Sequence, residues 1–365
     1  MMWTAVRSYE RRSEMEVRVE RTTNPKEKPD MSTVSFGSVF TDHMFLMDHD
    51  PENGWHDARI VPYGPLPIQP ASTVLQYAAE VFEGLKAYRT PDGSVQIFRP
   101  DENAKRMNNS AERMALPAMD VDMMVEAMVK LVEVDKNWVP SDPGTSLYIR
   151  PFLYGDDANL SLHPYTKSTF CIIMSPVGPY FPDGLKPVPL MIEEDDVRAV
   201  RGGTGYAKCG GNYAGAMRAG ARAEAKGYSQ VLWIDGVERK YVEEAGGMNV
   251  MFRIDGKMVT PQLNGSVLPG ITRKSAIEIF NDWGDEVEER LLPVDELITA
   301  IKEGRVSDAF MIGTAAVICP ISGVAYGDNL YEIENGETAQ KIYDAITDIQ
   351  WGRAEDKYGW CVKVG

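Results

Sequence analysis

The sequence predicts a two-domain α+β protein, and three observations lead to this prediction. Strand-like and helix-like segments are mixed in both halves, the 365 residues suit two domains of ordinary size, and a stretch rich in proline and glycine separates the halves. We expect a polar N-terminal extension over 1–34, a small α+β domain over 35–175, an interdomain linker over 176–187 and a large α+β domain over 188–365. A cofactor cleft is expected at the interface between the domains.

The first half begins with a predicted β-hairpin. Val81–Tyr88 and Val95–Phe98 are strand-like, and they flank the turn Pro91-Asp92-Gly93. Apolar residues at helical spacing then predict two helices, the first of them capped by Asp101. These helices are expected over 101–116 and 121–137, and two further strands over 146–154 and 169–174.

The second half alternates strands and helices in the same way. Asn212, Thr272 and Asp295 are expected to cap three helices, and a glycine follows the end of each. The helices are expected over 213–226, 272–283 and 295–303, and strands over 188–192, 230–234, 249–254 and 258–259. A turn of small residues, Gly313-Thr314-Ala315, lies between two apolar segments.

Charge and cysteine content exclude several classes of function. The net charge of −16 argues against nucleic acid or anionic lipid as the main partner and suits a cytoplasmic protein. The four cysteines are scattered and form no CxxC, and the four histidines form no HExxH, so we expect no disulfide framework and no metal site. The N-terminus lacks the apolar core of a signal peptide, and Met1 and Met15 are both candidate translation starts.

The first candidate catalytic residue is Lys208, which lies in the glycine-rich stretch 202–213. Glycines let the backbone approach a bulky ligand, and an amine desolvated in such a loop becomes a nucleophile for a Schiff base. A phosphate-binding Walker A loop does not fit, because Ala207 and Cys209 flank the lysine. A dinucleotide-binding glycine pattern fails as well. Taken alone, a lysine in such a loop is more often an inert surface cation.

Three further signals are weak individually. Glu244 precedes a strand and could face the ring nitrogen of a pyridine cofactor, although an exposed carboxylate is the commoner explanation. Leu268-Pro269-Gly270 opens the helix of Thr272, and a helix N-terminus presents free N–H groups to an anion. The amides of the Gly313-Thr314-Ala315 turn could bind a phosphate or carboxylate, or the turn could simply join two strands.

Together the motifs resemble the branched-chain aminotransferases, which are class IV pyridoxal-phosphate enzymes of fold type IV, the D-amino-acid-aminotransferase-like fold. The resemblance covers essentially residues 35–360. It rests on seven motifs that occur in the expected order: Phe82-Glu83-Gly84-Leu85-Lys86-Ala87-Tyr88, Phe98-Arg99-Pro100, Ser146-Leu147-Tyr148-Ile149-Arg150-Pro151, Lys208 with Gly210-Gly211-Asn212-Tyr213, Val231-Leu232-Trp233, Leu268-Pro269-Gly270 and Gly313-Thr314-Ala315.

The resemblance implies a role for each matching residue. Lys208 forms the Schiff base with pyridoxal 5′-phosphate and later moves the substrate proton, Tyr213 hydrogen-bonds the phenolic oxygen, and Glu244 pairs with the pyridinium nitrogen. The phosphate is held by Arg106, Ile271, Thr272 and Thr314, and the substrate carboxylate by the amides of Thr314 and Ala315. The side-chain pocket is implied to consist of Phe40, Tyr77, Phe82, Tyr148 and Tyr180, with Arg150 for the γ-carboxylate of glutamate.

The resemblance further implies a homodimer or higher homo-oligomer, because Leu160 and Leu162 match a loop that reaches the neighbouring subunit's site. The implied reaction is reversible ping-pong transfer of the amino group from L-leucine, L-isoleucine or L-valine to 2-oxoglutarate. Its reverse is the last step of branched-chain amino-acid biosynthesis. Two departures stand out: Ala316 replaces the first cysteine of the CxxC of animal members, and Gly247 replaces a common threonine. D-Amino-acid transamination, aminodeoxychorismate lysis and non-catalytic cofactor binding remain the alternatives.

Overall fold

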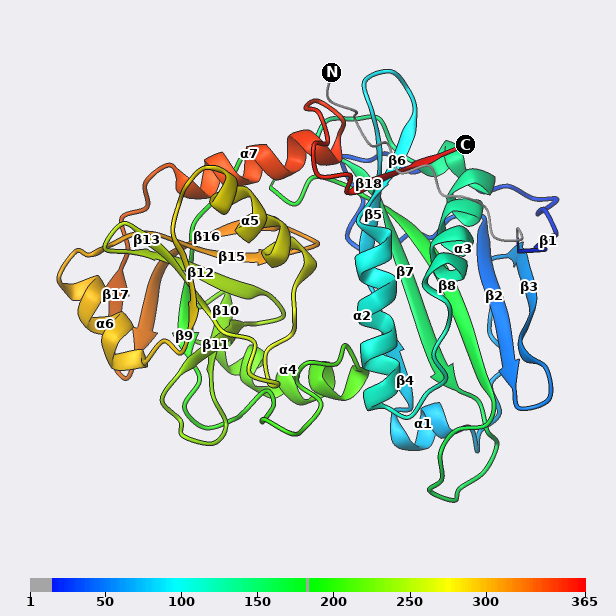
Figure 1. The fold of residues 1–365 in the computed structure, drawn as a ribbon, viewed down its shortest axis with the longest axis horizontal. Coiled ribbons are helices and arrows are strands. Elements are labelled where there is room, and N and C mark those ends of the chain that lie inside the picture. The colour runs from blue at the N-terminus through cyan, green and yellow to red at the C-terminus, as the bar shows by residue number, and fades with distance from the viewer. Residues whose placement is uncertain (1–14, 182–183) are drawn as a thin grey trace, which may run out of the picture. The chain divides into compact units, whose positions relative to one another are not determined.

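A computed structural model describes residues 15–181 and 184–365, in which two units are each built around a nine-stranded sheet. The first unit runs to Pro179 and includes Asp348–Gly365, and the second is Tyr180–Thr347. Figure 1 follows the chain through both units. Each contains helices and strands, which confirms the predicted α+β class.

The sheet of the first unit has the strand order β1-β3-β2-β8-β7-β5-β6-β18, and β4 pairs with β7 beside this path. Its long central pair, β7 and β8, is antiparallel over ten residues, from Ser146 opposite Val177 to Gly155 opposite Ser168. The strands are β1 (Arg18–Val19), β2 (His43–Asp50), β3 (Gly54–Pro62), β4 (Glu80–Phe82), β5 (Leu85–Arg89), β6 (Val95–Phe98), β7 (Ser146–Gly155), β8 (Ser168–Val177) and β18 (Cys361–Val364).

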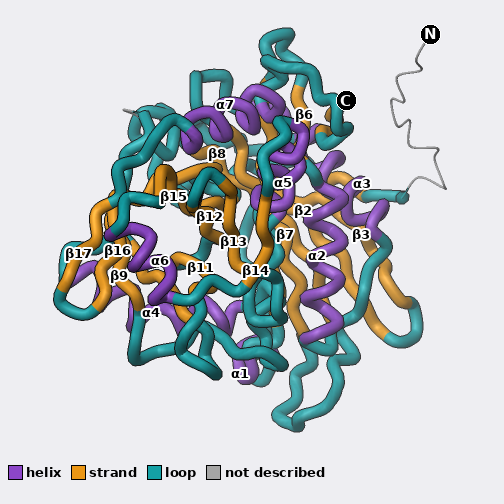
Figure 2. Tube along the Cα trace, turned by 60° about the vertical axis from the view of Figure 1, so that its left-hand side comes forward, coloured by secondary structure: helices purple, strands orange, loops and turns teal. Residues whose placement is uncertain are grey.

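Helices α2 (Pro100–Arg113) and α3 (Val121–Val134) run side by side over this sheet, as Figure 2 shows. Each buries one apolar stripe, represented by Met107 on α2 and Met128 on α3, so the helices shield one face of the sheet. A short helix α1 (Thr73–Tyr77) and a 3₁₀ turn (Lys136–Trp138) complete the unit.

The sheet of the second unit has the order β11-β10-β9-β16-β15-β12-β13-β14, and β17 pairs with β16. Its strands are β9 (Val188–Ile192), β10 (Gln230–Ile234), β11 (Val242–Ala245), β12 (Asn249–Ile254), β13 (Lys257–Pro261), β14 (Val287–Arg290), β15 (Val306–Gly313), β16 (Val317–Tyr326) and β17 (Asn329–Glu332). Its helices are α4 (Gly210–Ala225), α5 (Ile271–Asp282), α6 (Val294–Lys302) and α7 (Thr338–Gln350), whose last turn returns the chain to the first unit.

The end of the chain differs from the expected domain boundaries. The large domain is expected to include all of 188–365, but residues 348–365 belong to the first unit, because β18 pairs antiparallel with β6 from Cys361 opposite Phe98 to Val364 opposite Val95. The expected linker also begins too early, since Pro176 and Val177 are still part of β8. Of the expected N-terminal extension, residues 1–14 lie outside the described residues, and Arg18–Val19 pair with β3.

The predicted hairpin is confirmed by the antiparallel pairing of β5 with β6. The predicted caps are wrong at all four helices. Arg99, Cys209, Gly270 and Pro293 occupy the cap positions, and the residues expected there lie within the first helical turn. Asp101 and Asp295 still suit that place, since a carboxylate in the first turn complements the helix dipole.

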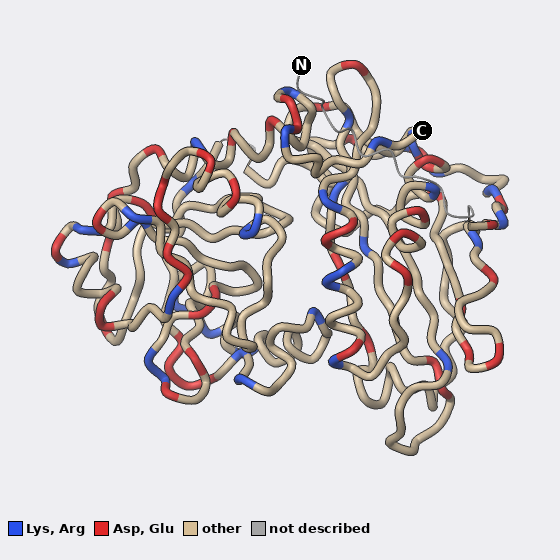
Figure 3. Tube along the Cα trace, viewed as in Figure 1, with Lys and Arg blue, Asp and Glu red and all other residues tan. Residues whose placement is uncertain are grey.

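Acidic and basic residues are interspersed along the chain in both units, as Figure 3 shows, whereas the cores are mainly apolar. The core of the second unit joins α6 to the sheet through Leu297, which is fully buried among residues such as Phe252 and Ile321. Within the described part of the chain, no helix is both long and apolar enough to span a bilayer.

We expect Leu297→Ala to lower the free energy of unfolding of the second unit by about 2–5 kcal/mol, because it removes buried methyl groups and leaves a cavity. Denaturant unfolding followed by circular dichroism measures this change. Leu291→Ala is the matched control: Leu291 is 38% exposed, and we expect a loss below about 1 kcal/mol. Equal losses in the two variants would contradict the packing described for α6.

Candidate active site

The loop that carries Lys208 connects β9 to α4 and is fixed from inside by Asn212. The Asn212 side chain accepts a hydrogen bond from Thr204 Oγ1 at 2.7 Å and donates to the carbonyls of Thr204 at 2.8 Å and Ala207 at 2.9 Å. Asn212 therefore holds the loop instead of capping the helix. The glycines allow close packing: a Cβ on Gly205 would overlap the carbonyl of Ser266.

Lys208 lies two residues before the first turn of α4 and is half-buried. Its Nζ donates a hydrogen bond of 2.7 Å to the hydroxyl of Tyr213, which is on that first turn. The lysine and the tyrosine that were expected to serve one cofactor are thus in direct contact. A phenol beside an amine can orient it and exchange a proton with it.

Glu244 lies on β11 and is only 2% exposed. Its Oε1 accepts a hydrogen bond from the Leu268 amide and forms an ion pair with Arg198 Nη2 at 3.1 Å. Burial raises the pKa of Glu244, and the charges of Arg198 and Lys208 act in the opposite direction. The exposed loop carboxylate, the commoner explanation of this position, is therefore wrong for Glu244.

Arg198 was not singled out from the sequence. It follows the acidic run Glu193-Glu194-Asp195-Asp196, and a basic residue near such a run is usually a surface charge. In the structure its side chain is 7% exposed, and its Nη2 also donates to the carbonyls of Gly205, at 2.9 Å, and Ser266. Its only sequence signal is its position ten residues before Lys208.

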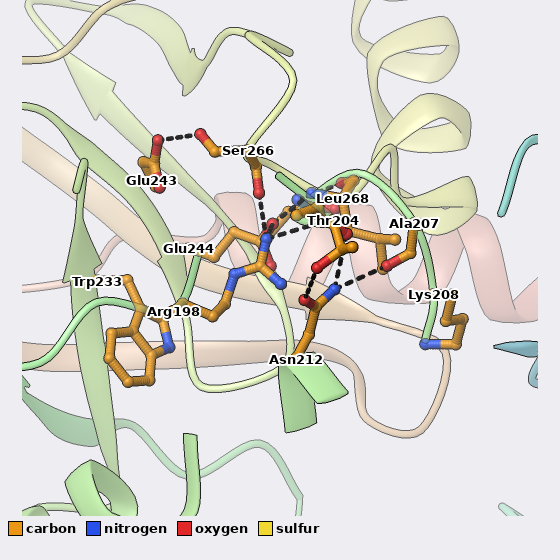
Figure 4. A network of polar contacts seen from close by, with 12 residues as sticks. Arg198, Thr204, Ala207, Lys208, Asn212, Trp233, Glu243, Glu244, Ser266 and Leu268 are labelled. Atoms are coloured by element: carbon orange, nitrogen blue, oxygen red, sulfur yellow. Dashed lines mark hydrogen bonds and ion pairs between the residues drawn. The ribbon is translucent and has the colours of Figure 1, made fainter. Parts of the chain in front are cut away.

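A cavity of about 820 Å³ in the second unit is bordered by several of these groups. Arg198, Tyr213 and Glu244 reach it, together with Trp233 and one side of α4. This volume falls within the range usual for small-molecule pockets, which is roughly 300–1,000 Å³. Figure 4 shows the polar contacts around Arg198, Asn212 and Glu244.

The groups expected to bind anions lie at two chain turns. Ile271 and Thr272 form the start of α5, where the amides of the first turn have no intrahelical acceptor. Thr314 and Ala315 form the turn between β15 and β16, which confirms the predicted turn, and both are half-buried. Each turn can donate N–H groups to a phosphate or carboxylate.

Arg106, the further group expected for the phosphate, is on α2 of the first unit and is buried. Its Nε and Nη2 donate to the two carboxylate oxygens of Glu83 at 2.8 and 2.7 Å. A bidentate pair of this kind fixes the plane of the guanidinium.

An aromatic and cationic cluster occupies one face of β4, β5 and β7 in the first unit. The Arg150 guanidinium lies 4.8 Å from the ring centre of Phe82, and its Nη2 donates to the Tyr148 hydroxyl at 3.1 Å. Gly84 makes this possible, because a Cβ there would overlap the Tyr148 oxygen. Phe36, which was not predicted, packs edge-on against Tyr148 at 4.9 Å.

Lys86 is a second cation on this face that was not predicted as a site residue. It lies directly opposite Tyr148 in the β5–β7 pair and is 8% exposed. Burial lowers the pKa of Lys86 to about 8. The alternation of a strand that contains Phe82 would have placed Lys86 on the same face, because side chains two residues apart point the same way.

The remaining predicted residues are placed less uniformly. Phe40 stacks on Tyr63, with 4.9 Å between the ring centres. The Tyr77 hydroxyl donates to the Leu160 carbonyl at 2.6 Å, so these two predicted residues do meet. Leu160 is 64% and Leu162 82% exposed on the β7–β8 loop. Tyr180, in the second unit, is half exposed and packs edge-on against Phe181.

Within residues 15–181 and 184–365, no three His, Cys, Asp or Glu side chains are grouped in a way that could hold a metal ion. All four cysteines are free, and burial raises the pKa of Cys319 to about 11. The site residues offer an amine, a phenol, buried carboxylates and amides that can bind an anion.

Comparison with known proteins identifies relatives over nearly the whole chain. Residues 80–324 match the family described as Amino-transferase class IV. The chain is 49% identical over 351 residues to branched-chain-amino-acid aminotransferase 2 of Bacillus subtilis (strain 168), covering 95% of this chain and 97% of that protein. Among solved structures, the branched-chain aminotransferase of Escherichia coli superposes with a TM-score of 0.74 at 27% identity, covering 89% of this chain and 99% of that one.

The branched-chain aminotransferase of Thermoproteus uzoniensis, solved with norvaline, gives the same TM-score of 0.74 at 26% identity, covering 88% of this chain and 100% of that one. The similarity thus extends through both units of the fold, including strands that sequence patterns alone did not predict.

We expect Asn212→Ala to release the Lys208 loop, because three hydrogen bonds of one side chain are lost. Hydrogen exchange should accelerate at the amides of Gly203 and Ala207, and the free energy of unfolding should fall by about 1–3 kcal/mol. Asn281→Ala, at an exposed position on α5, is the control and should change neither quantity. Unchanged exchange in Asn212→Ala would show that the loop does not depend on this side chain.

Proposed function

The chain belongs to the class IV aminotransferases, and from this membership we propose that it transfers the amino group of L-leucine, L-isoleucine or L-valine to 2-oxoglutarate. The products are the branched 2-oxo acid and L-glutamate, and the reaction is reversible and ping-pong. The observation that carries the proposal is the pairing of Lys208 with Tyr213 in the same unit as the buried carboxylate of Glu244.

Class IV aminotransferases use pyridoxal 5′-phosphate, and the residues present here fit that group. An aldehyde needs an amine, a phenolic oxygen needs a donor, and a pyridine nitrogen that must stay protonated needs an acid beside it. Lys208, Tyr213 and Glu244 supply these three groups around one cavity or on the adjoining loop. When bound, the cofactor withdraws electrons from the amino acid's Cα and so makes its proton acidic.

Lys208 is proposed to hold the cofactor and then to move the proton at the substrate Cα. Its Nζ is 2.7 Å from the Tyr213 hydroxyl, so the phenol orients the amine between these tasks. Glu244, which is shielded from water, is proposed to keep the proton on the ring nitrogen. We propose that the phosphate is bound by Arg106 and Thr314 and by the first-turn amides of α5 at Ile271 and Thr272.

Substrate recognition combines an apolar pocket with anion-binding groups. The amides of Thr314 and Ala315 are proposed to bind the α-carboxylate. The aliphatic side chain is proposed to meet Phe82 and Tyr148, because burying a branched side chain against aromatic rings is worth roughly 1.5–3 kcal/mol. Arg150 lies against both rings and is proposed to bind the γ-carboxylate of glutamate. Phe40, Tyr77 and Tyr180 are proposed to complete the pocket.

We also propose that the enzyme acts as a homodimer or a higher homo-oligomer in the cytoplasm. Leu160 and Leu162 are strongly exposed apolar side chains on one loop, which suits contact with a second copy. Four unpaired cysteines are usual in a reducing compartment. In the reverse direction the same reaction forms the branched-chain amino acids, and this direction is the proposed biosynthetic role.

Lys208→Ala should reduce transamination of L-leucine with 2-oxoglutarate by about 10²–10⁴-fold or more, because both the covalent anchor and the proton carrier are lost. It should also abolish the visible absorbance of covalently held cofactor. Steady-state kinetics and absorbance spectra measure these effects. Lys226→Ala, at an exposed lysine next to the end of α4, should retain both properties.

An aminotransferase of the proposed specificity prefers L-leucine to D-alanine and leaves aminodeoxychorismate intact. The opposite preference in the unmodified protein would assign a sister activity of the same fold. Cofactor binding without amino transfer from any of these compounds would make the protein a non-catalytic binder.

Arg150→Met should raise the KM for glutamate by about tenfold or more, since a charge-assisted hydrogen bond to the γ-carboxylate is lost. The KM for leucine should change much less, because methionine keeps the apolar contacts with Phe82 and Tyr148. Arg150→Lys retains the positive charge, so its KM for glutamate should lie between those of the wild-type protein and Arg150→Met. Equal increases for glutamate and leucine would exclude a γ-carboxylate role for Arg150.

A further inference from the structure

Arg198 connects three chain segments that carry the chemistry of the second unit. Its Nη2 meets the Glu244 carboxylate of β11, the Gly205 carbonyl of the Lys208 loop and the Ser266 carbonyl of the segment before α5. Figure 4 shows this convergence on a single guanidinium. An exposed arginine forms ion pairs of small consequence, but this side chain is only 7% exposed.

The contacts on Glu244 are unevenly divided between its two oxygens. Both the Leu268 amide and Arg198 Nη2 act on Oε1. These two contacts anchor one oxygen of the carboxylate, and neither of them involves the other oxygen, Oε2. An acid that must face a ring nitrogen needs this kind of fixed orientation, because a freely rotating carboxylate loses the geometry.

The Lys208 loop is tied to the same guanidinium. Gly205 is three residues before Lys208, and Asn212 continues the connection through Thr204 and Ala207. On the other side, Ser266 Oγ donates to Glu243, and Asn249 Nδ2 donates to the Leu268 carbonyl at 2.9 Å. The amine and the acid are therefore linked through Arg198 in addition to any group bound between them.

We propose that Arg198 is a positioning residue that keeps Glu244 charged and oriented. It also holds the loop of Lys208 in a fixed position relative to Glu244. The proposal rests on the function proposed above and assigns Arg198 a role through Glu244, without contact with the substrate. The charged groups that act on Glu244 are Arg198, Lys208 and Glu243. Of these, Arg198 opposes the effect of burial most strongly, and Glu243 reinforces it.

The direction of the pH effect follows from this charge balance. Burial raises the pKa of Glu244 and Arg198 lowers it, so removal of the guanidinium raises the pKa further. A carboxylate is charged only above its pKa. When Arg198 is replaced by a neutral residue, acidification should protonate Glu244 at a higher pH than in the wild-type protein. The affinity of this variant for pyridoxal phosphate should therefore begin to fall at a higher pH.

The test uses Arg198→Gln, Arg198→Lys and the full-length protein with its cofactor removed. Titration with pyridoxal phosphate, followed by fluorescence and absorbance, gives the dissociation constant across a pH series. We expect Arg198→Gln to bind the cofactor at neutral pH about tenfold more weakly than the wild-type protein. The acid limb, which is the low-pH part of the curve where affinity falls, should move up by about one pH unit. Arg198→Lys, which keeps the charge, should retain the wild-type acid limb.

Two comparisons separate this role from a general structural one. Arg201→Gln is the matched control, because Arg201 lies three residues away in an exposed ion pair with Glu238. It should behave like the wild-type protein. In a Glu244→Gln background, Arg198→Gln should cause no further shift of the acid limb, since the group through which it acts is gone.

Several outcomes would overturn the proposal. A wild-type acid limb in Arg198→Gln would do so, as would an equal shift in the Glu244→Gln background. If Arg198→Gln does not fold, Arg198→Lys decides: a wild-type limb supports the proposal, and a shifted limb overturns it. Failure of the proposed function gives a different result, because the unmodified protein would then neither bind pyridoxal phosphate through Lys208 nor transaminate L-leucine.

Discussion

A buried carboxylate beside a buried guanidinium is the interaction on which the second unit's site depends. Glu244 is 2% exposed, and an ionised group so far from water is stable only with a cation and hydrogen-bond donors around it. Arg198 and the Leu268 amide provide them. Removal of one partner from such a pair typically costs about 3–5 kcal/mol, which constrains both residues together. The glycine loop, β11 and the approach to α5 must therefore fold around one charge pair.

The same logic of pairing shapes the first unit, although with different residues. Glu83 holds the plane of Arg106 with two hydrogen bonds, and Tyr148 and Phe82 hold Arg150. In both places a planar cation is fixed by its neighbours before any ligand arrives. Fixed groups lose little conformational freedom on binding, so more of the interaction energy remains for recognition.

The residues that carried chemistry in the sequence were largely those with an unusual local setting. Lys208 among glycines and the small turn at Thr314 were recognisable because packing alone does not explain them. Arg198 could not be predicted as a site residue, because an arginine that follows four acidic residues is typical of a solvent-exposed segment. Only the tertiary fold brings it into contact with Glu244. The predicted helix caps were also wrong. At α4, for example, the Asn212 side chain hydrogen-bonds Thr204 and Ala207 in the preceding loop, and local propensity does not predict such contacts.

The return of the chain's last residues to the first unit has a consequence for synthesis on the ribosome. The strand β18, Cys361–Val364, completes the sheet edge at β6, yet it is translated more than 260 residues after that edge, which ends at Phe98. An unpaired strand edge is a template for association with other chains. The second unit is continuous in sequence and can fold as it emerges, whereas the first is incomplete until residues 348–365 are made. A chain that terminates before Cys361 would therefore lack a strand of the unit that was made first.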